Sequence, residues 1–181
     1  LILLQNISLQ LRKVPVLRGI NLQFEPGTVT VVMGANGTGK TSLLRIATGE
    51  WQASEGSVIF HGRPISEWTP TSRAQMMAVL PQTSTLNFPF LVEEVVMLGR
   101  TPHNRGLKRD KEIVKEALTC VDCSHLKDRF YTQLSGGEKQ RVQLARVLAQ
   151  IWEPVDGHSR LLLLDEPTAN LDLAHRYLCL K

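Results

Sequence analysis

The chain has 181 residues, of which 43% are apolar and 21% charged, a balance that is typical of one globular domain and excludes fibrous and disordered classes. Its apolar runs are far shorter than the ~20 residues of a membrane-spanning helix. A net charge of +4 is compatible with anionic partners such as phosphates, nucleic acid or a lipid surface. Three cysteines favour a reducing, cytosolic setting over a disulfide framework. Because the first residue is Leu1 and not Met, we expect an incomplete start.

The first part of the chain is predicted to form strands that lead into a glycine-rich loop. Alternating apolar and polar residues over Ile2–Phe24 predict half-exposed antiparallel strands, followed by a turn at Glu25–Gly27. The run Thr28–Met33 is β-branched and almost continuously apolar, which predicts a strand covered on both faces. A glycine-rich segment, Gly34–Gly39, comes next, and Lys40–Gly49 is predicted to be a short helix.

The rest of the chain alternates between short strands and a long helical stretch. Apolar residues at one-face spacing predict helices between Val92 and Gln150, and the basic stretch Arg100–Arg109 separates the first two. The sequence therefore predicts an α/β core with a helical insertion. Further strands are predicted at Val58–Phe60, Met77–Leu80 and Leu161–Leu164, and a final helix at Leu171–Leu180.

Residues 34–41 carry the motif G-x-x-x-x-G-K-[ST] between a predicted strand and a predicted helix. Its glycines let successive main-chain N–H groups curl around phosphate oxygens at the positive end of the helix. We expect Lys40 to reach the β- and γ-phosphates of ATP and the Thr41 hydroxyl to bind Mg²⁺. The alternative is a glycine-rich turn that happens to precede a lysine. The predicted nucleotide-binding residues are Gly34, Ala35, Asn36, Gly37, Thr38, Gly39, Lys40, Thr41 and Ser42.

Asp165 and Glu166 follow the predicted strand Leu161–Leu164, at the strand end where ligands gather in open α/β sheets. Asp165 would help to hold Mg²⁺, and Glu166 would orient and deprotonate an attacking water. A general base contributes ~10²- to 10⁴-fold to a rate. Taken alone, an acidic pair at a strand end is more often structural. The phosphate loop in the same chain favours the catalytic interpretation.

The segment Leu134–Gln140, here called the signature segment, contains a capping box with Ser135 as the N-cap and Glu138 three residues later. A capping box does not explain Gly136 and Gly137. Because glycine has no side chain, these residues leave the N–H groups of the first turn exposed at a positive helix end. We therefore predict a second anion site at Ser135, Gly136, Gly137 and Glu138. One nucleotide rarely needs two such sites in one chain, so this site is expected to serve a neighbouring copy.

The phosphate loop, the signature segment and the Asp165–Glu166 pair follow one another along the chain as they do in the ATP-binding subunits of ABC transporters. The chain resembles that family over essentially its whole length. Gln82 falls where that family has its glutamine loop, and Ala169–Asp172 where it has its aspartate loop. The resemblance implies an α/β fold of the P-loop NTPase type, with an antiparallel N-terminal β-subdomain and a helical subdomain. It implies a single ATP-binding domain whose three parts span residues 1–82, 83–150 and 151–181.

The resemblance also implies an ATPase that works as a pair of subunits. Two copies would pack head to tail, each ATP lying between the phosphate loop of one and the signature segment of the other. Gln82 would contact Mg²⁺ and water, and would couple the site to an integral membrane permease. A substrate-binding protein would be an indirect partner, no nucleic acid is expected, and the subunit would lie peripherally on the cytoplasmic face of the inner membrane.

A closer resemblance is to the hemin-import ATP-binding proteins, within the group that imports iron complexes and cobalamin. The lengthened loop Trp152–Arg160 supports it. The family selects its cargo through other proteins, so hemin rests on this resemblance alone. The other segments that carry it are Val79–Gln82, Leu86–Phe90, Val92–Val96, Leu98–Arg100 and Pro102–His103.

Two departures from the family pattern bear on activity. Leu11 stands where the family stacks an aromatic ring on adenine, so we expect weaker nucleotide selectivity. The family also has a switch histidine well beyond its aspartate loop, whereas this sequence ends at Lys181. We therefore expect a C-terminally incomplete domain that binds nucleotide, and turnover of ATP by this chain is left open. The alternatives are a soluble ABC-type ATPase acting on ribosomes or DNA, and a nucleotide-binding module without turnover.

Two other groups of residues have simpler interpretations. Cys120 and Cys123 lack the second ligand pair of a structural zinc site, so both are expected to be small buried hydrophobic residues. The basic stretch Arg100–Arg109 lacks the interleaved aromatic residues of a nucleic-acid platform and is expected to be a solvated loop.

Overall fold

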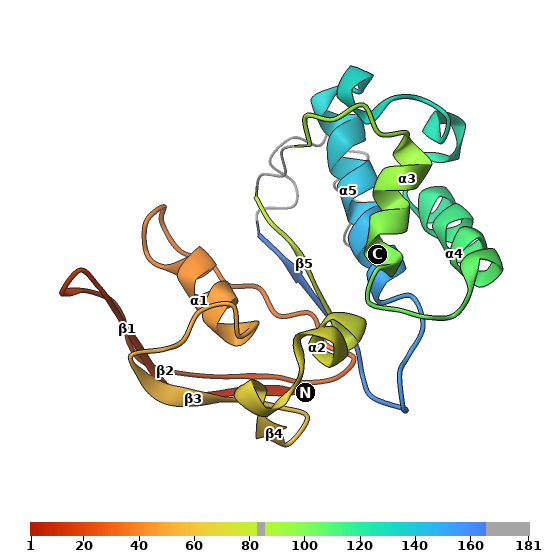
Figure 1. The fold of residues 1–181 in the computed structure, drawn as a ribbon. Helices are drawn as coiled ribbons and strands as arrows, with labels where there is room; N and C mark the ends of the chain where they lie inside the picture. Colours follow the sequence, from red (N-terminus) through yellow and green to blue (C-terminus); the bar gives the residue numbers. More distant parts are fainter. Residues whose placement is uncertain (83–85, 166–181) are drawn as a thin grey trace. The chain divides into compact units, whose positions relative to one another are not determined.

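The computed structural model describes residues 1–82 and 86–165. The chain divides into two compact units, which are described separately (Figure 1). Unit 1 comprises Leu1–Arg73 with Gly157–Arg160, and unit 2 comprises Ala74–Asp156 and the residues from Leu161 onward. Among the described residues, no helix combines the length and the hydrophobicity needed to cross a bilayer. Glu166, the aspartate loop and the predicted final helix lie outside the described residues.

Unit 1 contains a four-stranded antiparallel sheet in the order β2-β1-β3-β4 (Figure 1). Strand β1 (Ile2–Leu11) pairs with both β2 (Val14–Phe24) and β3 (Glu55–Phe60). The short strand β4 (Arg63–Pro64) pairs with β3. The structure thus confirms the antiparallel strands predicted over Ile2–Phe24 and the strand at Val58–Phe60.

A bulge in β1 keeps its apolar residues on one face of the sheet. Ile2 and Leu4 are buried, and so are Ile7 and Leu9, although a strict period of two would place the second pair on the opposite face. The pairing register shifts between Leu4 and Ile7, and Asn6 has a φ of 50°. One extra residue in a strand restores the alternation in this way.

The predicted strand at Thr28–Met33 is wrong. These residues form no strand, and Val29 and Met33 are both 86% exposed. A continuous apolar run becomes a covered strand only where neighbouring strands take up its N–H and C=O groups. The sheets of the described residues consist of β1 to β4 and of β5 with β6, and neither includes this segment.

Three helical elements complete unit 1 and lead out of it. Helix α1 (Lys40–Ala47) buries Leu43, Ile46 and Ala47, and it ends before Gly49, which has a φ of 71°. A 3₁₀ turn, η1 (Ile65–Glu67), and helix α2 (Pro70–Met76) follow. The helix predicted over Lys40–Gly49 is thus confirmed.

Unit 2 combines a two-stranded parallel sheet with three helices (Figure 1). Strand β5 (Met77–Leu80) pairs with β6 (Leu161–Leu164), with Met77 opposite Leu161 and Leu80 opposite Leu164. Both strands agree with the sequence prediction. The helices are α3 (Val92–Met97), α4 (Leu107–Cys120) and α5 (Gly136–Gln150), and the 3₁₀ turns are η2 (Leu98–Arg100), η3 (Ser124–Leu126) and η4 (Tyr131–Gln133).

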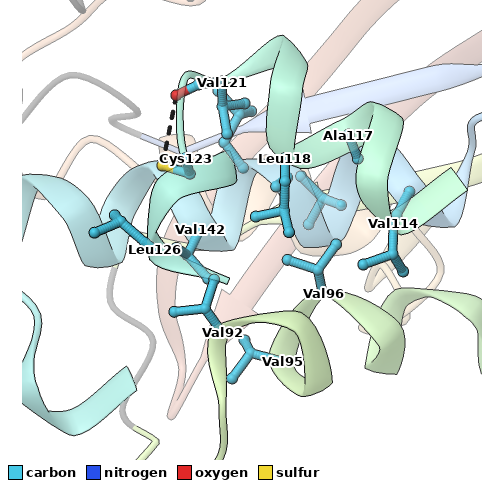
Figure 2. Close-up of a cluster of buried hydrophobic side chains, with 14 of the residues drawn as sticks. Val92, Val95, Val96, Val114, Ala117, Leu118, Val121, Cys123, Leu126 and Val142 are labelled. Atoms are coloured by element: carbon cyan, nitrogen blue, oxygen red, sulfur yellow. Dashed lines mark hydrogen bonds between the residues drawn. The ribbon is translucent and has the colours of Figure 1, made fainter. Parts of the chain in front are cut away.

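The three helices of unit 2 share one apolar core (Figure 2). Burying one Val, Leu or Ile side chain stabilises the fold by about 1.5–3 kcal/mol. Helices α3, α4 and α5 contribute Val92, Val95, Val96, Ile113, Val114, Ala117, Leu118, Val142 and Ala145.

Cys123 lies in this core, and its thiol contacts the Val121 carbonyl oxygen at 3.5 Å. Cys120 is exposed, so the expectation of two buried cysteines is wrong for Cys120.

The basic stretch Arg100–Arg109 is only partly a solvated loop. Arg105 and Lys108 are exposed, as expected, but Arg100 is only 3% exposed. Its Nε donates a hydrogen bond to Asp110 Oδ1 at 2.8 Å. The prediction fails for Arg100 because the Asp110 carboxylate and the Ala149 carbonyl oxygen accept hydrogen bonds from it in place of water.

We expect Gly56→Ala to destabilise unit 1 by about 3 kcal/mol or more. Gly56 has a φ of 91°, and a Cβ there would overlap the carbonyl oxygens of Gln5 and Asn6 at the bulge. Gly62→Ala is the matched control, because its φ is 77° but a Cβ would meet no described atom within 4 Å. The control should cost about 1 kcal/mol. Denaturant unfolding measures both, and equal losses would contradict the role of the bulge.

Candidate functional site

The phosphate loop of unit 1 curls around the ammonium group of its own lysine. Lys40 Nζ donates hydrogen bonds to the carbonyl oxygens of Gly34 and Ala35, both at 2.9 Å. The Thr38 hydroxyl donates to the Ala35 carbonyl oxygen at 2.9 Å. The loop therefore has a defined conformation, with the positive charge of Lys40 held inside the curl.

Helix α1 follows this loop directly, and the residue that caps its start is a glycine. Its N-cap, Gly39, has a φ of 92° and makes no side-chain capping hydrogen bond. A Cβ at Gly39 would lie 3.0 Å from side-chain atoms of Val16 and Leu17, so both the backbone conformation and the packing favour glycine. Because first-turn N–H groups have no partner within their own helix, this end of α1 is suited to an anion.

The parallel pairing of β5 and β6 brings two predicted metal ligands to one edge of unit 2. Gln82 follows β5 by two residues and is exposed, whereas Asp165 follows β6 directly and is buried. The Asp165 N–H donates to the Leu80 carbonyl oxygen at 2.9 Å, which extends the ladder by one residue. The carboxyl ends of parallel strands meet at the same edge, and there α/β proteins bind their ligands.

The predicted magnesium ligands have the chemistry that Mg²⁺ prefers. Thr41 offers a hydroxyl, Gln82 an amide oxygen and Asp165 a carboxylate, all of them hard oxygen donors. Thr41 lies in unit 1, and Gln82 and Asp165 lie in unit 2. Among residues 1–82 and 86–165, no group of three or more His, Cys, Asp or Glu residues is gathered as for a separate metal site.

The signature segment forms the predicted capping box at the start of α5. Glu138 N–H donates to Ser135 Oγ at 3.4 Å, and Glu138 Oε2 accepts from Ser135 N at 2.8 Å and from Ser135 Oγ at 2.7 Å. These hydrogen bonds from Ser135 lower the pKa of the Glu138 carboxyl. Ser135 is therefore confirmed as the N-cap of α5.

The glycine that follows Ser135 leaves open space at the start of α5. Gly136 is exposed, and a Cβ there would meet no described atom within 4 Å. Packing among residues 1–82 and 86–165 therefore does not require glycine at this position. Arg129 Nη1 lies 3.9 Å from Glu138 Oε1, so positive charge also accompanies this helix end. The open first turn is consistent with a second anion site.

A groove of about 840 Å³ runs along α3 and α4, on a different part of unit 2. None of the predicted nucleotide or metal ligands lines it, so we do not place nucleotide there. Its apolar lining includes Met97, Val114 and Leu118, and its charged lining includes Lys111, Lys115 and Lys127.

Sequence reasoning missed two features outside the predicted site. An exposed aromatic patch consists of Phe88, Phe90 and Phe130. The Phe88 and Phe90 rings lie 6.3 Å apart, and the Phe90 carbonyl accepts from Tyr131 N–H at 2.8 Å, next to Phe130. Two phenylalanines shortly after Gln82 could have indicated this patch. The second feature is buried Arg100, whose partners only the tertiary structure reveals.

The loop, the uncapped helix start and the strand edge define a nucleotide-binding α/β protein with a phosphate loop. The chain belongs to the ABC transporter family, whose profile matches residues 17–169. This confirms the predicted family and the α/β fold of ABC ATPases. In line with this, the structure of cbiO1 from Clostridium perfringens, part of the ABC transporter complex cbiONQ, is similar with a TM-score of 0.79 at 27% identity, over 96% of this chain and 68% of that one.

Two relatives are both named hemin import ATP-binding protein HmuV. Hemin import ATP-binding protein HmuV of Gloeobacter violaceus is 53% identical over 163 residues, which cover 89% of this chain and 59% of that protein. HmuV of Pseudomonas fluorescens strain Pf-5 is 50% identical over 177 residues, which cover 98% and 69%. The chain thus spans 59% and 69% of the length of these two relatives.

We expect Ser135→Ala to destabilise α5 by about 1 kcal/mol, because the N-cap acceptor is lost. Ser135→Asn keeps a capping acceptor, so its free energy of unfolding should stay within a few tenths of a kcal/mol of that of the original chain. Thermal unfolding followed by circular dichroism measures both variants. Equal stability of the alanine and asparagine variants would show that the capping box contributes little.

Proposed function

We propose that this chain is the ATP-binding subunit of an ABC importer for hemin and that it hydrolyses MgATP. The phosphate loop carries the proposal, since Lys40 Nζ already lies within its curl at the start of α1. Hemin as cargo is supported by the relatives that are named hemin import ATP-binding proteins. No residue of this chain need contact the cargo.

Binding of the triphosphate would use main-chain N–H groups of residues 34–41 together with Lys40. When ATP enters, its phosphate oxygens would replace the Gly34 and Ala35 carbonyl oxygens as acceptors for Lys40 Nζ. A charged hydrogen bond to phosphate is stronger than one to a neutral carbonyl. Leu11, 41% exposed near the end of β1, would give adenine an apolar contact in place of aromatic stacking.

The reaction is in-line transfer of the γ-phosphoryl group to water, which depends mainly on positioning and charge stabilisation. Thr41, Gln82 and Asp165 would hold Mg²⁺, which neutralises charge on the β- and γ-phosphates. Gln82 would also orient the attacking water. Glu166, outside the described residues, would accept its proton.

A second copy would complete the site through its signature segment. Ser135 and the first-turn amides of Gly136, Gly137 and Glu138 would approach the γ-phosphate of the ATP bound to the other subunit. The open space around Gly136 supports this proposal. Glu138 already occupies hydrogen-bond donors of this helix end, so an incoming phosphate would compete with its carboxylate.

We propose that the aromatic patch Phe88, Phe90 and Phe130 contacts the integral membrane permease. Contiguous exposed apolar patches commonly mark interaction surfaces. Phe88 is 69% exposed and follows the glutamine loop, the region that the family resemblance assigns to this contact. Such contact would keep the subunit on the cytoplasmic face of the membrane, with a substrate-binding protein as an indirect partner.

Lys40→Ala should weaken MgATP binding about 10- to 100-fold, as expected for the loss of one or two charged hydrogen bonds. Lys108→Ala, which removes an exposed lysine from α4, is the control of equal charge and should bind as the original chain does. Equilibrium titration with a fluorescent ATP analogue measures both. Undiminished affinity in the Lys40 variant would overturn the proposed function, and a parallel turnover assay separates an ATPase from a binding module.

Phe88→Ala should weaken binding to vesicles that carry the permease about tenfold, since buried aromatic residues dominate interface energies. Leu107→Ala is the matched control, because Leu107 is 65% exposed at the start of α4 and lies outside the patch. Co-sedimentation measures the binding. Preference of the original chain for ribosomes or DNA over these vesicles would favour the soluble ATPase.

A further inference from the structure

The segment Gly99–His103 holds the C-terminal end of α5, at the opposite end from Ser135. Arg100 Nη1 donates a hydrogen bond to the Ala149 carbonyl oxygen at 2.7 Å. His103 Nε2 donates to the Gln150 carbonyl oxygen at 2.6 Å. The last carbonyl groups of a helix have no partner within it and carry partial negative charge. Donors from Arg100 and His103 therefore suit this position.

Arg100 is fixed by carboxylates as well as by the helix. Besides its 2.8 Å hydrogen bond to Asp110, its Nη2 lies 3.9 Å from Glu153 Oε2. The Arg100 guanidinium is 3% exposed and is held from two sides by hydrogen bonds of its Nε and Nη1. Burial also lowers the pKa of His103, which favours its neutral ring, and the Gln150 carbonyl oxygen requires the proton on Nε2.

Gly99 brings this segment directly onto the backbone of α5. A Cβ at Gly99 would overlap the Arg146 carbonyl oxygen, one turn before the end of the helix. Glycine is required here by close approach of two backbones and not by its φ angle. A side chain at position 99 would push the segment away from α5, so this close approach depends on glycine.

The same end of α5 is tied to the start of strand β5. Gln150 Nε2 donates to the carbonyl oxygens of Ala74 and Met77, at 2.8 and 3.0 Å. Gln75 Nε2 donates to the Pro102 carbonyl oxygen at 2.8 Å. These groups all belong to unit 2. Strand β5 leads on to Gln82 and pairs with β6, which leads on to Asp165.

We propose that Arg100, His103 and Gln150 form a clasp that sets the orientation of α5 against β5. The clasp thereby positions Ser135 relative to the strand edge that carries Gln82 and Asp165. The 15 residues of α5 span about 22 Å, so a tilt of about 5° at the clasp would displace Ser135 by about 2 Å. These are positioning residues, since none of them would touch the nucleotide.

This inference rests on the proposed function, because Ser135 matters only if it closes over the ATP of a second copy. His103→Leu and Gln150→Leu each break the clasp, and His103→Gln keeps a donor and should restore it. His125→Leu is the matched control, since His125 is an exposed histidine of η3 in the same unit.

The full chain and each variant are compared in three measurements. Titration with a fluorescent ATP analogue reports on the phosphate loop and should change less than about twofold. Analytical ultracentrifugation with MgATP reports on dimer formation, which the leucine variants should weaken about tenfold, the effect of one lost hydrogen bond. Amide hydrogen exchange at Asp165, remote from the clasp, should accelerate in the leucine variants and not in His125→Leu.

Dimer formation or Asp165 exchange equal to that of the original chain would overturn the clasp. So would a joint loss of nucleotide binding and dimer formation that His103→Gln does not restore, because the contacts would then only maintain the fold. If the original chain itself fails to dimerise with MgATP, the proposed function is overturned, and exchange at Asp165 still decides whether the clasp fixes the strands.

Discussion

Main-chain N–H groups at the first turn of a helix have no partner within that helix, and this constraint governs both candidate anion sites. The start of α1 has glycine as its N-cap, so no side-chain oxygen occupies the position. The start of α5 has Ser135 and Glu138, which cap it from within the chain. Under the proposed function, phosphate would bind directly at the start of α1, whereas at the start of α5 it would compete with an internal carboxylate.

This difference gives the two sites different tasks. The phosphate loop holds Lys40 by hydrogen bonds to two carbonyl oxygens, which a triphosphate can outcompete because its oxygens are charged. At α5 the competitor is a carboxylate whose pKa is already lowered by Ser135. A phosphate presented by a second subunit would therefore need a well-placed helix. The proposed clasp at the far end of α5 would meet this requirement.

The segment Leu98–His103 resembles a known family in sequence, and the structure shows which contacts its residues make. In the sequence it serves only as one point of resemblance to the hemin-import ATP-binding proteins. In the structure, Gly99 permits backbone contact with α5, Arg100 and His103 donate to its last carbonyls, and Pro102 accepts from Gln75. Each of these roles depends on residues distant in the sequence.

The sequence by itself determined the local elements and the motif chemistry of this protein. Strand alternation, the phosphate loop, the capping box at Ser135 and the one-face spacing of α4 and α5 all depend on residues a few positions apart. Tertiary structure alone decided the burial of Arg100, the bulge at Asn6 and the exposure of Thr28–Met33. Each of these depends on whether backbone or side-chain groups distant in the sequence provide a hydrogen-bond partner. The periodicity of apolar residues does not show which distant groups will pair.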